Sequence, residues 1–348
     1  MKTGLSLTQM AAKVEAQIAQ KRDYVIESSA VEMTEAGDEL VVYTNDEVLQ
    51  LGVTDTMHRQ LAQATGIHGQ YYKKMRESAP HLIAVNVKHW LREQGDRTHV
   101  LRTMGNQARA FLGGGYEIID HDQVLESLML ELEKLNGDLE ILSTEVTDSK
   151  LYIKLAFPKI EGEVRAGDII RSGATIYNSE IGEGGLNVYP ANFRLICTNG
   201  MTRTEQGERL TVRHSGSKIR DIGEILSRDR ANVKLEHFIE NFTIAHDEAA
   251  FQRTLNQMKQ STQRPIELSV EELLNRAKKH FGLTLAEQKQ ALEHLLIDED
   301  LTAYGLMNAI TRTAHDPASY DRASELEAIG SRVLNVSDAQ WRELAIAP

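Results

Sequence analysis

The sequence predicts an α+β protein with a central, mainly antiparallel sheet and a packed helix, flanked by N-terminal helices and a C-terminal helical bundle. Three observations support this fold class. Residues 141–197 contain apolar runs and alternating segments separated by Gly-rich turns, and both ends of the chain carry capping boxes before apolar residues at helical spacing. With 26% charged and 41% hydrophobic residues, the 348-residue chain has ordinary globular composition and enough length for two to three folding units.

The N-terminal part, residues 1–79, is interpreted as a helical region with a short extended segment. Ser6 and Gln9 form a capping box before the apolar stripe of Met10, Val14 and Ile18. Residues 25–43 have extended character, and helical spacing returns from 54 to 76 with a break at Gly66.

The break at Gly66 has the pattern of a helix-turn-helix. Ala62 precedes the glycine by four residues, and Ile67, Tyr72 and Met75 follow at packing positions. A second helix packed in this way would point five side chains outward, namely His68, Gln70, Tyr71, Lys73 and Lys74. Helical corners with a glycine are common, so a purely structural corner is the alternative.

The central part, residues 80–215, is predicted to hold the sheet. Leu82 to Val87 and Val100 to Leu112 are interpreted as strands, followed by a turn at glycines 113–115. Asp120 and Gln123 form a second capping box before an amphipathic helix. Two hairpins follow, at 141–157 and 168–197.

The C-terminal part, residues 216–348, is predicted to be helical. Capping boxes recur at Ser269/Glu272, Thr284/Glu287 and Ser337/Gln340, and Pro265 and Pro317 interrupt the helical pattern.

Composition excludes several classes of protein. The single Cys197 cannot form an internal disulfide or a multi-cysteine zinc site, and no apolar run approaches the roughly 20 residues of a membrane helix. The segment MKTGLSLTQMAAK lacks the features of a secretion signal, so we expect a cytoplasmic protein without membrane association.

Basic residues are concentrated in two segments of this acidic chain, whose net charge is −12. From 81 to 116 there are five Lys or Arg against two acids, and from 191 to 220 six against two. Such a local basic stripe can bind phosphate, although basic side chains at exposed strand edges are the alternative. The candidate nucleic-acid-binding residues are Arg102, Asn106, Arg109, Arg194, Asn199, Arg213, His214 and Lys218.

Arg109, Arg213 and Lys218 are predicted to line one groove that binds the backbone of a single strand. Arg109 precedes the triple-glycine turn, and the other two flank a Ser215-Gly216-Ser217 turn. In the competing interpretation, Arg109 and Arg213 pair instead with the acidic segment 117–148, which contains ten Asp or Glu and one Lys.

Catalytic motifs are not distinctive, and we assign no catalytic residue, metal ligand or cofactor. The triple glycine lacks the Lys-Ser/Thr of a phosphate-binding loop. Asp120-His121-Asp122 could contribute to a metal site and Cys197 could act as a thiol nucleophile, but helix capping and a buried small side chain explain them as well.

Three blocks in order, RTMGNQARAFLGGGYEIIDHDQVLESL, FRLICTNGM and VRHSGS, together resemble the phage- and plasmid-borne family with the domain of unknown function number 932. The similarity covers roughly residues 50 to 320 and includes AYGLMNAIT at 303–311. The resemblance implies a protein of a mobile element or prophage and supplies no catalytic residues.

The sequence therefore predicts a nucleic-acid-binding protein of a phage, prophage or plasmid. We expect it to bind or anneal single-stranded DNA in recombination or replication and to form homo-oligomers that cover the sheet edges. The layer arrangement resembles that of phage strand-annealing proteins, which is an analogy of fold only. An enzyme of nucleic acid or nucleotide metabolism, or a protein that binds a host factor, remains the alternative.

Overall fold

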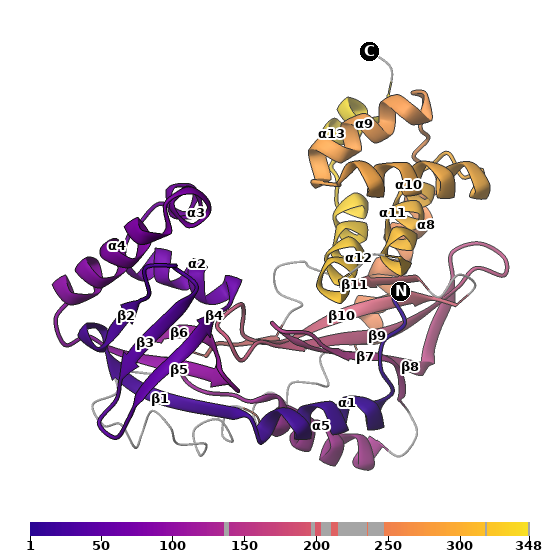
Figure 1. The fold of residues 1–348 in the computed structure, drawn as a ribbon. Helices are drawn as coiled ribbons and strands as arrows, with labels where there is room; N and C mark the ends of the chain where they lie inside the picture. The colour runs from indigo at the N-terminus through magenta and orange to yellow at the C-terminus, as the bar shows by residue number, and fades with distance from the viewer. Residues whose placement is uncertain are drawn as a thin grey trace.

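The computed structural model describes residues 1–135, 139–195, 199–202, 210–214, 235, 247–316 and 319–346. Within these residues the chain forms two six-stranded sheets with helices packed on them (Figure 1). The predicted α+β class with a C-terminal helical region is confirmed.

The first sheet has the strand order β1-β5-β6-β4-β3-β2. Its one parallel pair joins β4 to β6, where Gly52 lies opposite Gln107. A parallel pair needs a long crossover connection, and here the crossover contains three helices. The strands are β1 (Lys21–Glu27), β2 (Val31–Met33), β3 (Glu39–Tyr43), β4 (Val48–Val53), β5 (Thr98–Met104) and β6 (Gln107–Gly113), with a short 3-10 helix at Ser28–Ala30.

Of the crossover helices, α2 (Asp55–Ala64) and α4 (Pro80–Glu93) pack on this first sheet, and α3 (Gly69–Ser78) packs on α2 and α4. Leu61 of α2 and Val87 of α4 belong to one core with Leu40 and Val42 of β3. Because these helices have their apolar positions at a spacing of three to four residues, each turns one face to the sheet and the other to solvent.

The second sheet is antiparallel throughout, in the order β7-β8-β9-β10. Two short strands pair with β10 at different positions: β11 lies opposite 191–194 and β12 opposite 186–188. Both predicted hairpins are confirmed. The strands are β7 (Glu140–Val146), β8 (Leu151–Glu163), β9 (Ile169–Asn178), β10 (Leu186–Arg194), β11 (Asn199–Thr202) and β12 (Leu210–Val212).

Helices α1 (Leu7–Ile18) and α5 (His121–Leu135) lie below the second sheet in Figure 1. Met10 and Val14 of α1 share a core with Val124 of α5 and Ile153 and Ile176 of the sheet. The predicted capping box that starts α1 is present.

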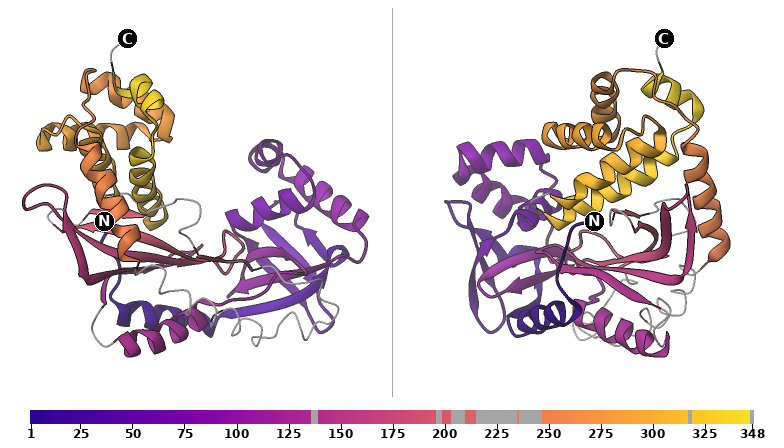
Figure 2. Two further views of the ribbon diagram at one scale, coloured as in Figure 1. Left: turned by 180° about the vertical axis from the view of Figure 1, so that it is seen from behind. Right: turned by 90° about the vertical axis from the view of Figure 1, so that its right-hand side faces the viewer.

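The C-terminal helices pack on the other side of the second sheet, as both views of Figure 2 show. Helices α11 and α12 contact β11, and α8 contacts β8. Lys154 of β8 and Glu327 of α12 are buried and form an ion pair of 2.8 Å. The helices are α8 (Glu248–Ser261), α9 (Val270–Phe281), α10 (Leu285–Asp298), α11 (Ala303–Arg312), α12 (Tyr320–Leu334) and α13 (Asp338–Ala345), with a 3-10 helix at Thr313–His315.

Capping begins several of these helices as the sequence predicts. The boxes at Thr284/Glu287 and Ser337/Gln340 are complete. Ser269 accepts a hydrogen bond from the backbone of Glu272. No helix in the described parts of the chain combines the length and apolar character needed to cross a membrane.

Two predictions about the first sheet are wrong. Residues 82–87 belong to helix α4, because Pro80 provides a helix start and Ile83, Val87 and Leu91 repeat at helical spacing on the buried face. The predicted single strand from Val100 to Leu112 is a hairpin that turns at Gly105, whose φ is +55°.

The predicted boundary between residues 79 and 80 divides the strands of the first sheet, because β1 pairs with β5 and β4 pairs with β6 across it. The boundary at 215/216 lies among residues outside the described part of the chain.

Candidate nucleic-acid interface

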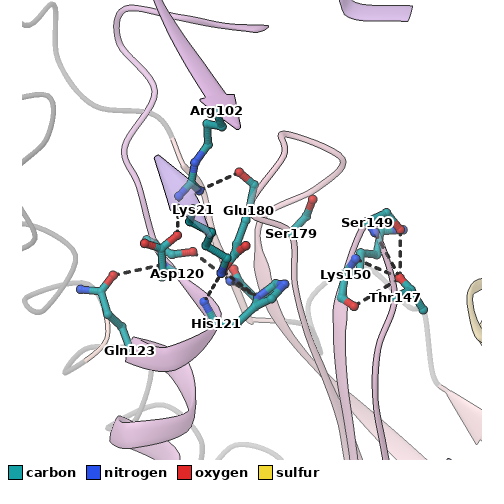
Figure 3. Close-up of polar contacts among 12 residues, drawn as sticks. Lys21, Arg102, Asp120, His121, Gln123, Thr147, Ser149, Lys150, Ser179 and Glu180 are labelled. Atoms are coloured by element: carbon teal, nitrogen blue, oxygen red, sulfur yellow. Dashed lines mark hydrogen bonds and ion pairs between the residues drawn. The ribbon is translucent and has the colours of Figure 1, made fainter. Parts of the chain in front are cut away.

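A buried network of charged side chains joins the two sheets, and Glu180 lies at its centre (Figure 3). Glu180 follows strand β9 and its carboxylate is inaccessible to solvent. It forms ion pairs with Lys21 of β1 and with Arg109 of β6, the latter at 3.4 Å, and accepts the backbone N–H of His121 at 2.8 Å. Burial acts to raise the pKa of Glu180, but His121, Lys21 and two arginines hold it well below its usual range.

Arg102 is the second centre of this network and is only 2% exposed. Its guanidinium donates to both carboxylate oxygens of Asp23 at 2.8 and 3.1 Å, to Asp120 at 2.6 Å and to the backbone oxygen of Glu180 at 2.9 Å. Burial acts to lower the pKa of Arg102, and Asp120 and Asp23 raise it above its usual value. Arg102 therefore uses its donors to join the two sheets.

The Asp120-His121-Asp122 sequence is part of the same network. Asp120 binds Arg102, and its backbone N–H donates to the Gln123 side chain at 3.1 Å, which is half of the predicted capping box. His121 is buried and accepts a hydrogen bond from Asn178 at 3.1 Å. Burial lowers the pKa of His121 to about 4. No group of three potential metal ligands occurs among the residues that the structure describes.

The structure thus places four of the eight predicted site residues in internal polar contacts. Arg102 and Arg109 share Glu180 as a partner. Arg194, on β10, makes a bidentate ion pair with Asp168 at 2.6 and 3.0 Å. His214 is buried, stacked on Tyr116, and lies 3.1 Å from the amide oxygen of Asn178.

The other four predicted residues are placed differently. Asn106 is exposed in the β5–β6 turn, and Arg213 is exposed after β12. Asn199 belongs to β11 by its backbone, and its side chain lies outside the described part of the structure. Lys218, with Cys197 and the Ser215–Ser217 turn, also lies outside the described residues. The groove of Arg109, Arg213 and Lys218 consequently remains a prediction.

Arg109 itself has an internal partner in the structure. Its side chain is 8% exposed and contacts Glu180 together with the backbone oxygen of Asp148 at 3.4 Å. The competing interpretation named the acidic segment 117–148 as the partner of Arg109, but the carboxylate that Arg109 meets is Glu180, and that segment contributes only the backbone oxygen of Asp148. One sequence signal could have indicated a buried ion pair. Arg102 lies within the apolar strand segment 98–104, and an arginine buried in such a strand needs an acidic partner.

An exposed polar face is formed by the helix pair α2–α3. Thr54 caps α2, and Gly66, with a φ of +70°, allows the tight turn into α3. Tyr72 is buried, and its hydroxyl lies 3.1 Å from Nδ1 of His58, which holds the two helices together. The five side chains predicted to point outward are all exposed: His68, Gln70, Tyr71, Lys73 and Lys74.

A hollow of about 940 Å³ lies between α2 and α3 and opens to solvent beside these side chains. Arg59 and Lys73 line it from opposite helices, together with Gln63 and Gln70. Arg59 also lines a second hollow of about 550 Å³, which reaches the β7–β8 turn and the first turn of α12. The two hollows are together called the cleft: α2 and α3 line the first, and in the second Thr56 and Arg59 of α2 share the lining with the β7–β8 turn and α12.

A family model for the domain of unknown function DUF932 matches residues 110–327, which is more than half of the chain. The chain belongs to this family. Neither the curated proteins nor the solved structures contain a significant match to it.

The DUF932 segment contains part of the buried network and leaves the helix pair outside. Asp120, His121 and Glu180 fall within residues 110–327, whereas Lys21, Arg102 and all of α2–α3 precede them. The matched segment thus includes the second sheet and most of the C-terminal helices, whereas the exposed helix pair and the first sheet, apart from the end of β6, are N-terminal to it.

Charge is distributed unequally across the cleft of this DUF932 protein. On the α2–α3 wall, Arg76 pairs with Asp55 at 2.6 Å, and Lys73, with a side chain 76% exposed, lies 3.8 Å from Glu77. Lys74 adds a further exposed cation. Beyond α2, the second hollow presents Glu145, Asp148, Glu183 and Asp321 together with Lys2 and Lys13. Because acidic side chains are in excess there, a polyanion would be attracted to the exposed lysines of α3 rather than to the second hollow.

Proposed function

We propose that the protein binds single-stranded nucleic acid, with DNA as the favoured form, along the exposed face of α3. The observation that carries the proposal is the side-chain chemistry of this face. Lys73 and Lys74 supply charge for phosphates, Gln70 supplies an amide that can hydrogen-bond bases, and Tyr71 is a 54% exposed aromatic ring.

Tyr71 favours a single strand over a duplex. An aromatic ring can stack on an unpaired base of any sequence, and each such stack contributes about 1–3 kcal/mol. The open hollow beside α3 provides space for bases that leave the strand axis. The excess of acidic side chains in the second hollow favours a phosphate backbone on the α3 side.

This proposal moves the binding surface away from the arginines that the sequence suggested. Internal polar contacts hold the side chains of Arg102, Arg109, Arg194 and His214. The exposed side chains of α3 can contact a ligand without breaking those contacts. We further propose that the strand bound on α3 takes part in annealing during recombination or replication. The same proposal includes that the protein belongs to a phage, prophage or plasmid.

The test is fluorescence anisotropy with labelled oligonucleotides of one length, single-stranded and duplex, across a salt series. Lys73→Gln/Lys74→Gln should weaken single-strand binding and reduce the salt slope by roughly 1.4, because each phosphate contact contributes about 0.7. Tyr71→Ala should lose about 5- to 150-fold in affinity with an unchanged slope, as expected for one lost stack.

Matched controls come from the same chain. Lys278→Gln/Lys279→Gln removes a lysine pair of equal charge from α9, in the C-terminal helices, and should leave binding unchanged. Arg109→Ala should lower stability and leave the salt slope of the folded protein as in the wild type. Absence of single-strand binding, or equal losses in the α3 and α9 variants, would refute the proposal. Tighter binding of duplex would instead indicate insertion of α3 into a groove.

A further inference from the structure

Helix α10 carries an exposed apolar surface that the proposed function does not use. Leu285, Leu296 and Ile297 are 57%, 56% and 68% exposed, and Leu301 follows the helix at 45%. The opposite face of α10 is packed normally, because Ala291 and Leu295 are fully buried in the C-terminal core. The helix therefore has an apolar surface on both sides, although a solvent-facing side is ordinarily polar.

The exposed side of α10 has charged residues at its middle and apolar residues at its ends. Leu285, Lys289, Glu293 and Leu296 follow one another at intervals of four, four and three residues, which places them on one face of the helix. Ile297 extends the C-terminal end of this face. No ion pair within the described residues engages Lys289 or Glu293, so their charges remain available for a partner.

This arrangement is complementary to itself. When two copies of α10 pack antiparallel about a two-fold axis at the level of residue 291, position 289 of one copy faces position 293 of the other. Lys289 then meets Glu293 twice, once on each side of the axis. In the same register Leu285 lies level with Ile297 of the second copy, and Leu296 lies level with a small alanine one position after Leu285. The large apolar side chains of the helix are thus grouped at both ends of the pair, and the two charges are matched at its centre.

We propose that α10 is the dimerisation surface of this protein and that its partner is a second copy of the chain. An unrelated partner would not require opposite charges placed symmetrically about the middle of the face. Helix α10 lies among the C-terminal helices, apart from the α2–α4 layer (Figure 1), so the dimer leaves both α3 faces open. Because one helix pair makes a small interface, the dimer is expected to be weak and concentration-dependent.

The experiment measures mass by sedimentation and by light scattering over a wide range of protein concentration. The wild type should shift from 39.0 kDa towards twice that mass as concentration rises. Ile297→Glu should remain monomeric. Lys289→Glu and Glu293→Lys should each weaken the dimer by at least about tenfold, because each places like charges opposite one another twice.

Mixing supplies the decisive arm. A Lys289→Glu chain and a Glu293→Lys chain have complementary faces, so their mixture should form a heterodimer, and the double variant on one chain should dimerise like the wild type. The substituted side chains are exposed, and circular dichroism checks that each variant is folded. A wild type of 39.0 kDa at every concentration would overturn the proposal. So would charge reversals without effect, or single variants that mixing does not restore. None of these outcomes depends on nucleic-acid binding.

Discussion

Acidification should destabilise this protein through His121, and the size of the effect follows from its burial. His121 is 1% exposed, and its pKa is lowered from 6.5 to about 4 in the folded chain, chiefly by burial. Between these values the unfolded chain binds a proton that the folded chain does not bind. Stability is therefore fully present above about pH 6.5 and falls as the pH is lowered towards 4. Between pH 7 and pH 5 this single group should remove about 2 kcal/mol.

The assay is urea unfolding at a series of fixed pH values, for the wild type and for His121→Gln. His58 and His99 also have pKa values lowered to about 4 by burial, so the variant keeps part of the pH dependence. The free energy of unfolding of the wild type minus that of His121→Gln should be about 2 kcal/mol smaller at pH 5 than at pH 7.

Thr103→Ser is the control for this experiment, because it changes a buried polar side chain in β5 without adding or removing a titratable group. Its effect on stability should be the same at every pH. If His121→Gln and the wild type lose equal stability between pH 7 and pH 5, the protonation argument is wrong, whatever the variant costs at neutral pH.

Two further outcomes test the packing. Lys154→Met should lower the free energy of unfolding by about 3–5 kcal/mol, because it leaves Glu327 buried without its cation. Adding Glu327→Leu should recover most of that stability. Additive losses from the two substitutions would contradict a coupled pair. Gly66→Ala should lower the stability by about 1–2 kcal/mol because of its φ of +70° alone, since no atom lies within 4 Å of the new methyl group. Gly69→Ala, in the first turn of α3, should instead raise the stability by a few tenths to about 1 kcal/mol. Similar shifts of the melting temperature for both variants would refute this reasoning.

The sequence predicted those parts of the fold that depend on nearby residues. The hairpins of the second sheet are joined by short turns, and the helix starts are specified within four residues, so both can be deduced locally. The outward side chains of α3 follow from the same kind of local spacing. The first sheet escaped prediction because its parallel pair joins residues 52–53 to 107–108 across three helices. No short-range pattern specifies such a pairing.

The internal contacts of four predicted site residues could not be deduced from the sequence for a related reason. Composition identified arginines in basic segments, and an arginine on the surface is indistinguishable in composition from one in a buried ion pair. The carboxylates that engage Arg102 come from residues 23 and 120, and Arg109 meets residue 180. Only the folded chain brings these groups together. The exposed α3 side chains were predicted correctly as a surface, and their role stays a proposal.

The network around Glu180 also sets a limit on folding during synthesis. Lys21 is synthesised 159 residues before its ion-pair partner Glu180. Until then Lys21 and Arg109 lack this carboxylate, and β1 has no fixed connection to the second sheet. Early pairing of β1 with β5 would bury uncompensated charge. The attachment of β1 to the second sheet should therefore form late in folding, because it depends on a contact of high sequence separation.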